Sequence, residues 1–182
     1  MSRRRFNKMN CAVAQALDQI GDWWTLLIVR EAFYGKTSFS AFQRNLGIAR
    51  NILANRLAHL VRKGILARRR VRPGVDRHSY HLTAKGRDLL PLLITLMQWG
   101  DRWVVGSGSE PIRILDAEHR KQIRRIEIIS TDGRPLSIEQ LRFRPGPGAG
   151  PGILQRFAER RQASKARGSQ ASAERAGRLR RR

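Results

Sequence analysis

The spacing of apolar and polar positions is most regular between residues 39 and 82, where it predicts a helix followed by two short strands. Within residues 47–64, apolar side chains recur on one helical stripe: Ala49, Leu53, Leu57 and Leu60. Polar side chains fall on the opposite face: Asn51, Asn55, His59 and Arg62. Residues 65–72 and 77–82 have extended character and flank a Pro-Gly turn at residues 73–76. The predicted order is therefore helix, strand, basic turn and strand.

Three shorter helices are predicted before residue 47. Residues 11–20 carry apolar side chains at helical spacing. Asp22 is a candidate N-cap for residues 23–34, which are apolar on nearly every face and so belong at the centre of the core. Ser38 is a candidate N-cap for a short helix that Gly47 ends, in the place of the positioning helix of a helix-turn-helix.

A long last helix is predicted over residues 84–104, with Thr83 as its cap. Its apolar residues lie on more than one face, and a single small domain cannot cover them all. We expect a partner helix from a second copy of the chain. The residues expected to hold this dimer together come from the first and last helices: Leu17, Leu89, Leu93, Leu96 and Trp99.

The chain beyond this helix has a different composition. Residues 105–111 are rich in Gly and Ser and predict a linker. Residues 112–144 predict a small β-ribbon appendage, with strands at 112–115 and 125–129 and an Asp-Gly turn at 131–134. Residues 145–182 begin as a Pro/Gly linker and continue as a basic tail that we expect to be disordered apart from a transient helix near 153–161.

The expected fold class is mainly α with a small β-wing. A winged helix-turn-helix domain occupies residues 11–104, including the C-terminal dimerisation helix, and follows a basic N-terminal arm at residues 1–10. The β-ribbon appendage and the disordered basic tail complete the chain. At 182 residues, the chain is long enough for one core with extensions but not for two large domains.

Charge and cysteine content narrow the classes of function. The chain has 37 Lys and Arg against 14 Asp and Glu, a net charge of +23, which attracts a polyanion such as DNA, RNA or an acidic membrane surface. The single cysteine, Cys11, allows no disulfide framework within one subunit and fits a reducing cytoplasm. The N-terminus lacks the apolar core of a signal peptide, and the apolar run at 89–97 is too short to span a bilayer. We expect a soluble cytoplasmic protein without a membrane partner.

The predicted helix and wing carry side chains suited to duplex DNA. Asn pairs bidentately with adenine and Arg with guanine, which favours base contacts by Arg50, Asn51 and Asn55 over a merely solvated helix face. The tip of the wing can reach the backbone, so Arg72 and Arg77 are expected on phosphates. The full set of expected DNA-binding residues is Ser38, Arg50, Asn51, Asn55, Arg56, His59, Arg72 and Arg77. Two alternatives stay open within it, because Ser38 can act as a cap alone and Arg56 can support the fold through a buried contact.

Other chemistry is sparse. Cys11 lies near a helix N-terminus and follows basic residues, surroundings that favour a reactive thiolate; a buried inert thiol is the alternative. The four histidines lack metal-ligand spacing, so no metal site and no cofactor are expected. The four tryptophans could form the walls of a ligand pocket, but aromatic residues at helical spacing more often belong to a core or a dimer interface. No nucleophile–base pair, carboxylate dyad or Gly-rich phosphate loop stands out in the first hundred residues, and an enzyme is not expected.

Over residues 11–104 the sequence resembles the HxlR-type family of bacterial winged-helix transcriptional regulators, a branch close to the MarR regulators. The matching features are Cys11, ALDQIGDWWTLLIVRE at 16–31, FSAFQ at 39–43, GIA at 47–49, LANRL at 53–57, Leu60, Gly64, YHLTAKG at 80–86 and Trp99-Gly100. The resemblance implies a cytoplasmic, nucleoid-associated homodimer on a roughly palindromic operator, with a recognition helix in each major groove and a wing on the flanking backbone. Some relatives use a cysteine near position 11 as a redox or electrophile sensor, which the resemblance implies for Cys11, with the effector unknown.

Two features depart from the family pattern. Gly21-Asp22-Trp23 stands where a Gly-Lys-Trp is usual, which removes a positive charge. The cysteines of the zinc ribbon in some relatives are absent from the appendage, so no zinc site is carried over. Two other classes remain as alternatives: an RNA-binding winged helix, and a protein-interaction module that uses the apolar last helix.

Overall fold

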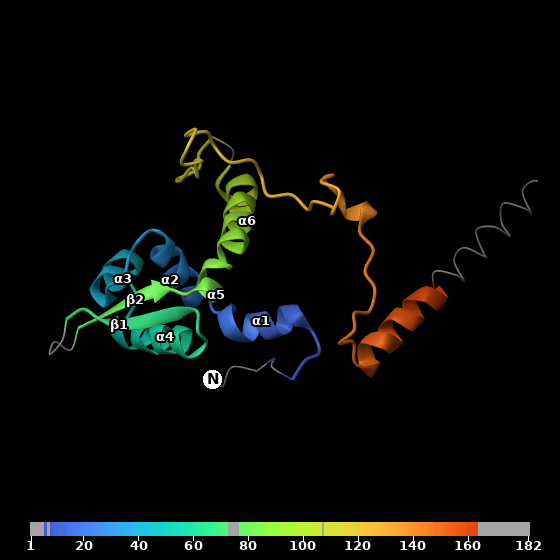
Figure 1. Cartoon of the computed structure of the whole chain (residues 1–182), viewed down its shortest axis with the longest axis horizontal. Coiled ribbons are helices and arrows are strands. Elements are labelled where there is room, and N and C mark those ends of the chain that lie inside the picture. The colour runs from blue at the N-terminus through green and yellow to red at the C-terminus, as the bar shows by residue number, and fades with distance from the viewer. Residues whose placement is uncertain (1–5, 7, 73–76, 107, 164–182) are drawn as a thin grey trace, which may run out of the picture.

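The computed structural model describes residues 6, 8–72, 77–106 and 108–163. Helices build most of the folded body, one two-stranded antiparallel sheet projects from it, and an extended segment leads away to a separate helix at residues 151–163 (Figure 1). The fold is the predicted one, mainly α with a β-wing. No helix among the described residues is long and apolar enough to cross a membrane.

The first three helices form where the sequence predicts them, α1 from its apolar spacing and α2 and α3 from their capping residues as well. α1 (Ala12–Ile20) has Cys11 as its N-cap residue. α2 (Trp23–Phe33) begins at Asp22, whose side chain accepts a hydrogen bond from the Trp24 amide. α3 (Phe39–Leu46) begins at Ser38, whose hydroxyl accepts from the Ala41 amide, and ends at Gly47 in the left-handed conformation (φ +61°).

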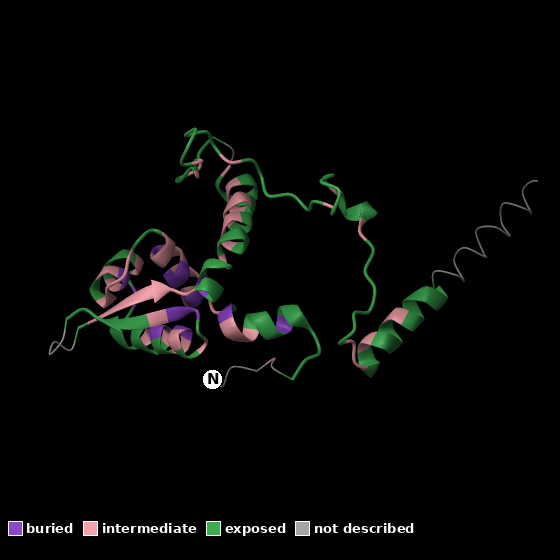
Figure 2. Ribbon diagram, viewed as in Figure 1, coloured by how far each residue is buried: buried purple, intermediate pink, exposed green. Residues whose placement is uncertain are grey.

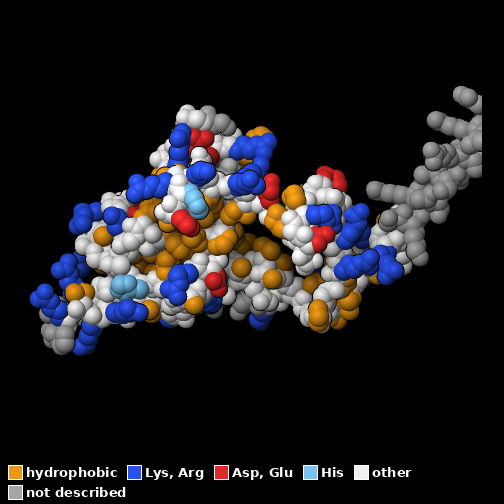
Figure 3. Space-filling view, turned by 45° about the horizontal axis from the view of Figure 1, so that its top comes forward, with side chains coloured by type: hydrophobic (Ala, Val, Ile, Leu, Met, Phe, Trp, Pro, Cys, Tyr) orange, Lys and Arg blue, Asp and Glu red, His pale blue; other side chains and the backbone are white. Residues whose placement is uncertain are grey.

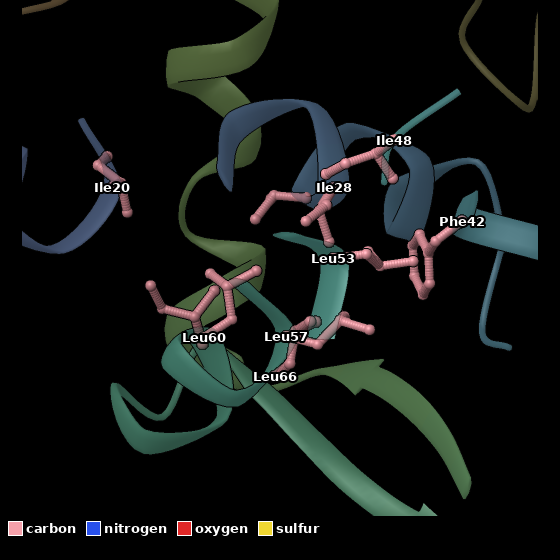
Figure 4. Close-up of a cluster of buried hydrophobic side chains, with 10 residues drawn as sticks. Ile20, Ile28, Phe42, Ile48, Leu53, Leu57, Leu60 and Leu66 are labelled. Carbon is pink, nitrogen blue, oxygen red and sulfur yellow. The ribbon is translucent and has the colours of Figure 1, made fainter. Parts of the chain in front are cut away.

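α4 (Arg50–Arg62) completes the helix-turn-helix and packs into the core. Leu53, Leu57 and Leu60 are buried on its inner stripe, as predicted, and meet Ile28 of α2 and Phe42 of α3 (Figure 4). Ala49 does not belong to that stripe. It is exposed and serves as the N-cap residue, because the helix starts three residues later than position 47.

The wing consists of β1 (Leu66–Arg70) and β2 (His78–Leu82), which pair antiparallel with Arg68 opposite Tyr80. Both strands are shorter than the predicted runs 65–72 and 77–82, and the turn at 73–76 lies outside the described residues. A single bridge between Ser38 and Ser79 joins the start of α3 to the sheet. The bridge thus fixes the second strand of the wing to the helix-turn-helix.

The long last helix predicted over 84–104 is interrupted. α5 (Ala84–Arg87) is capped by the Thr83 hydroxyl as expected, but it ends there, and α6 (Leu90–Gly100) begins after a turn. Pro91 explains the break, because proline has no amide proton and its ring clashes with the carbonyl four residues earlier. A π-helical segment, η1 (Asp101–Val105), then extends α6.

The appendage differs from the expected β-ribbon. Residues 112–144 contain two isolated bridges, Leu115 with Gln122 and Ile129 with Pro135, and a short 3-10 helix, η2 (Ile138–Gln140), instead of strands that pair with each other. The predicted turn at 131–134 does form, with Gly133 at φ +84°. Strand-like segments without a third strand or a packed face to cover them do not extend into a stable ribbon. Figure 2 shows that this segment is exposed over nearly its whole length.

Where the structure describes it, the basic tail contains a helix at the place where one is expected, near residues 153–161. Residues 151–163 form a helix that begins with Pro151, a residue favoured in the first helical turn. Within it, Gln155 donates a hydrogen bond to Glu159 at a spacing of four residues. The helix extends two residues beyond the expected range at each end, and residues 164–182, where disorder is expected, lie outside the described residues.

Candidate nucleic-acid interface

The outer face of α4 presents three of the predicted base-reading side chains. Arg50, Asn51 and Asn55 are all exposed. Arg50 stacks over the Phe39 ring at 5.4 Å, which ties its side chain to the start of α3. The N-cap residue Ala49 supplies no side-chain acceptor, and the Asn51 side chain accepts a hydrogen bond from the Ile52 amide at 2.9 Å. Asn51 and Asn55 are four residues apart, so they lie on the same side of the helix.

Two other predicted α4 residues make contacts inside the domain. Arg56 forms an ion pair with Asp22 at 2.9 Å, and its Nε is buried without a hydrogen-bond partner among the described residues. His59 Nε2 lies 2.8 Å from the Gln19 carbonyl oxygen. The structure therefore ties Arg56 to the start of α2 and His59 to α1. These positions support the fold-supporting alternative for Arg56 and take His59 off the free helix face.

The same arrangement gives the unusual Asp22 two roles. Its carboxylate caps α2 and pairs with Arg56, so it links the first turn of α2 to the middle of α4. Asp22, which stands where the family usually has a lysine, is thus paired with Arg56 on the facing helix. Sequence reasoning identified the cap but not this pair, because the two residues are 34 positions apart in the chain and nothing local marks them as neighbours.

The wing carries a dense group of exposed arginines. Arg68 contacts His78 across the sheet, with 3.0 Å between Nη2 and Nδ1, while Arg69 and Arg70 are exposed beside it. Arg72 and Arg77 are exposed on either side of the undescribed tip, and the hydrogen bond from the Val71 amide to the Arg77 carbonyl holds the two ends of the turn together. Figure 3 shows Lys and Arg side chains gathered at this end of the molecule.

Ser38 is committed to the fold. Its hydroxyl caps α3 by accepting from the Ala41 amide at 3.2 Å and lies 3.3 Å from the Ser40 hydroxyl. The neighbouring Thr37 carbonyl accepts from the Tyr80 amide at 2.8 Å. Capping therefore accounts for this serine, and a phosphate contact through it remains a prediction.

A buried acid fixes the position of α3. Glu31 of α2 is only 5% exposed and accepts hydrogen bonds from Arg30 at 2.8 Å and from Asn45 of α3 at 2.9 Å. Burial alone raises the pKa of the Glu31 carboxyl, but the hydrogen bonds from Asn45 and Arg30 and the charges of Arg30 and Lys36 outweigh it, so the pKa lies below its usual value of 4.5. The cluster holds the positioning helix against α2, and no local pattern in the sequence marks it.

Cys11 is exposed at the N-terminus of α1, so the alternative of a buried thiol is wrong. Its role as a sensor stays a prediction. Within the described part of the chain, no group of three His, Cys, Asp or Glu side chains could hold a metal ion. An apolar hollow of about 290 Å³ lies between α2, α6 and residues 111–114, and none of the four tryptophans lines it.

The residues predicted for dimerisation divide into two groups. Leu17 on α1 is 46% exposed, and Leu96 and Trp99 on α6 are 50% and 53% exposed. Leu89 and Leu93 instead pack partly against the core of their own chain. The second group contributes to the monomer fold, so only the first has a largely open side chain for a partner.

Comparison with known proteins gives a consistent result. The profile of the HxlR-like helix-turn-helix family matches residues 19–107. An uncharacterised HTH-type transcriptional regulator of Mycobacterium tuberculosis, Rv3095, is 37% identical over 137 residues, which cover 75% of this chain and 87% of that protein.

Two solved structures, both described as transcription factors, match most of the chain. PA1607 has a TM-score of 0.71 at 38% identity, over 77% of this chain and 98% of its own. PA1374 of Pseudomonas aeruginosa has a TM-score of 0.57 at 33% identity, over 80% of this chain and 99% of its own. With its helix-turn-helix, its basic wing and these matches, the chain belongs to the HxlR-like helix-turn-helix family of transcriptional regulators.

Proposed function

We propose that this protein is a sequence-specific DNA-binding transcriptional regulator that binds a roughly palindromic operator as a homodimer. The observation that carries the proposal is the pairing of two surfaces at one end of the domain. The exposed face of α4 offers Arg50, Asn51 and Asn55, and the wing beside it offers exposed arginines, including Arg72 and Arg77. In proteins that recognise duplex DNA, side chains on a helix contact base edges and specify the sequence, while nearby cationic side chains bind the phosphate backbone. The two surfaces of this domain suit these two roles.

The recognition helix supplies sequence choice in this account. The major groove admits an α-helix, and each base pair presents a distinct pattern of donors and acceptors there. Asn51 and Asn55 lie on one side of α4 and can reach neighbouring base pairs, while Arg50 suits guanine or a phosphate. The wing arginines add affinity that does not depend on sequence, because phosphates are the same everywhere along the duplex.

A homodimer follows from the apolar side chains left open on α1 and α6. Leu17, Leu96 and Trp99 are about half exposed, and Trp103 on η1 is 63% exposed. A second copy related by a two-fold axis covers such a surface with the same surface. Two recognition helices related in this way read half-sites about one helical turn of DNA apart.

The basic tail adds electrostatic affinity for DNA of any sequence. Residues 153–182 contain ten Lys and Arg against two Glu. Such a segment binds through release of counterions, so its contribution weakens steeply with salt. The protein then works in the cytoplasm, associated with the nucleoid when it is bound to DNA.

Selection of genomic fragments tests the proposal directly. The purified full-length protein is incubated with sheared genomic DNA at about 150 mM salt, where the Debye length is near 8 Å, and the bound fragments are sequenced. We expect a small set of enriched sites that share an inverted repeat. The control is the double variant Asn51→Ala with Asn55→Ala, which should retain DNA but lose the enrichment. Uniform recovery of all fragments by the unchanged protein, or preferential retention of added RNA, would contradict the proposal.

A further inference from the structure

The segment that follows η1 forms an arm, defined here as residues 112–148. It passes the end of α6, where the Gln98 side chain holds it through both atoms of its amide. The Gln98 oxygen accepts from the Ile126 amide at 2.9 Å, and its nitrogen donates to the Arg124 carbonyl at 3.2 Å. This pair of bonds imitates the pairing of a neighbouring strand. The arm is therefore attached to α6 at a defined position.

The far end of the arm returns to the other helix of the proposed dimer surface. Asn10, which stands just before α1, donates a hydrogen bond from its side chain to the Gly148 carbonyl at 3.0 Å. The arm thus runs from the end of α6 to the beginning of α1, and Figure 1 shows its backbone as a wide arc between these two attachments.

The middle of the arm carries apolar side chains that the rest of the described chain leaves open. Ile128 is 54% exposed, Ile138 76% and Phe143 68%. The same holds for Trp99 and Trp103 on α6 and η1, and Figure 3 shows hydrophobic side chains gathered across the middle of the molecule on the side of the arm. An apolar surface spread over two helices and an arm exceeds what a soluble monomer ordinarily leaves open.

Total surface area supports the same conclusion. The chain exposes 15104 Å², whereas a compact monomer of 20.8 kDa exposes about 9,000 Å². Residues outside the described ranges cannot account for the whole excess. Even full exposure at about 165 Å² per residue would give them only about 5,000 Å². The described chain therefore exposes more surface than a compact globular monomer of the same mass.

We propose that the arm packs against a second copy of this chain, so that each subunit's arm lies over the α1 and α6 surface of the other. The proposal rests on the homodimer proposed above and names the segment that completes it. A second copy is the occupant that the observations favour, because the arc of the arm bounds the same helices whose open residues form the dimer surface. The match to PA1607 covers 77% of this chain, while the family profile ends at residue 107, so that relative also has chain beyond the winged helix.

Photo-crosslinking between isotopically distinct copies tests whether the arm of one subunit contacts the other subunit. The photoreactive residue p-benzoyl-phenylalanine replaces Phe143 in the full-length protein, and equal amounts of ¹⁴N- and ¹⁵N-labelled protein are mixed, exchanged and irradiated. We expect crosslinked peptides of mixed isotope composition that join the arm to α1 or α6. Crosslinks within one isotope only, or none, in a protein that sediments as a dimer would overturn the proposed contact of the arm with the second subunit. They would not contradict the homodimer itself. Sedimentation as a monomer would overturn both.

A pair of matched variants gives an equilibrium measurement of the same contact. Ile128→Asp removes an exposed apolar side chain from the arm of each subunit, and we expect the dimer dissociation constant to rise by at least about tenfold. Thr131→Asp adds the same charge at an exposed position in the nearby turn and should change it less than about twofold. Sedimentation equilibrium measures both, and unchanged thermal unfolding checks that the body of each subunit is intact. Equal effects of the two variants would overturn the proposal.

Discussion

Replacing Arg72 and Arg77 with alanine removes two exposed guanidinium groups from the base of the wing tip. In a homodimer the double variant loses four such groups. If each one neutralises a phosphate, the slope of log binding constant against log salt becomes shallower by about 0.9 per phosphate, or about 3.6 in all. Between 50 and 200 mM salt, the unchanged protein should then lose up to about 150-fold more affinity than the variant.

Fluorescence anisotropy on a short labelled duplex measures this slope at several salt concentrations. The matched control is Arg113→Ala with Arg125→Ala, which removes the same charge from exposed positions in the arm. We expect the wing variant to weaken operator and random DNA by a similar factor, because phosphate contacts carry no sequence information. Parallel salt dependences for the wing variant and the unchanged protein would show that these arginines do not touch phosphate.

The proposed dimer surface, the buried acid and the cysteine each allow a further test. Leu96→Glu with Trp99→Glu should give monomers by light scattering with unfolding close to that of the unchanged protein, because both side chains are about half exposed; a persistent dimer would refute this interface. The pKa of Glu31 is lowered in the folded protein, so its stabilising contribution is present above the ordinary pKa of 4.5 and is lost as the pH falls through the lower folded value. Urea unfolding from pH 7 to pH 3 should show a loss of stability that Glu31→Gln lacks. If Cys11 is a sensor, peroxide should change operator affinity about fivefold or more, and Cys11→Ser should abolish the change; an equal response in both proteins would exclude this role.

Local signals predicted the parts of the fold that local physics determines. Asp22, Ser38 and Thr83 each cap a helix at the expected place, because a cap depends only on the next three residues. The stripe of Leu53 and Leu57 was also predictable, since helical spacing and burial coincide there. In the last helix, the apolar pattern continues through Pro91 and predicts one uninterrupted helix. The helix is broken there nonetheless, because the effect of the proline on the backbone exceeds that of the pattern.

Interactions between distant residues account for most of what the sequence did not show. Arg56 reaches Asp22 and His59 reaches Gln19 only because α4 lies across α1 and α2, so a face that looks polar and open in projection is partly closed. The arm failed as a predicted β-ribbon for a related reason. Its strand-like segments have the composition of strands, but the described chain offers them no third strand, and the side chain of Gln98 bonds to the backbone of the arm only at Arg124 and Ile126.

The central claim is that α4 selects sequence while the wing supplies affinity, and the ratio of specific to nonspecific binding tests it most directly. Asn51→Ala and Asn55→Ala should each lower this ratio by roughly 5- to 150-fold, because each removes a bidentate pair with a base, worth about 1–3 kcal/mol. Arg72→Ala and Arg77→Ala, measured on the same operator and random duplexes, should leave the ratio within about twofold. If the two asparagine variants keep the ratio and the two wing variants lower it, α4 does not read the operator and the account is wrong.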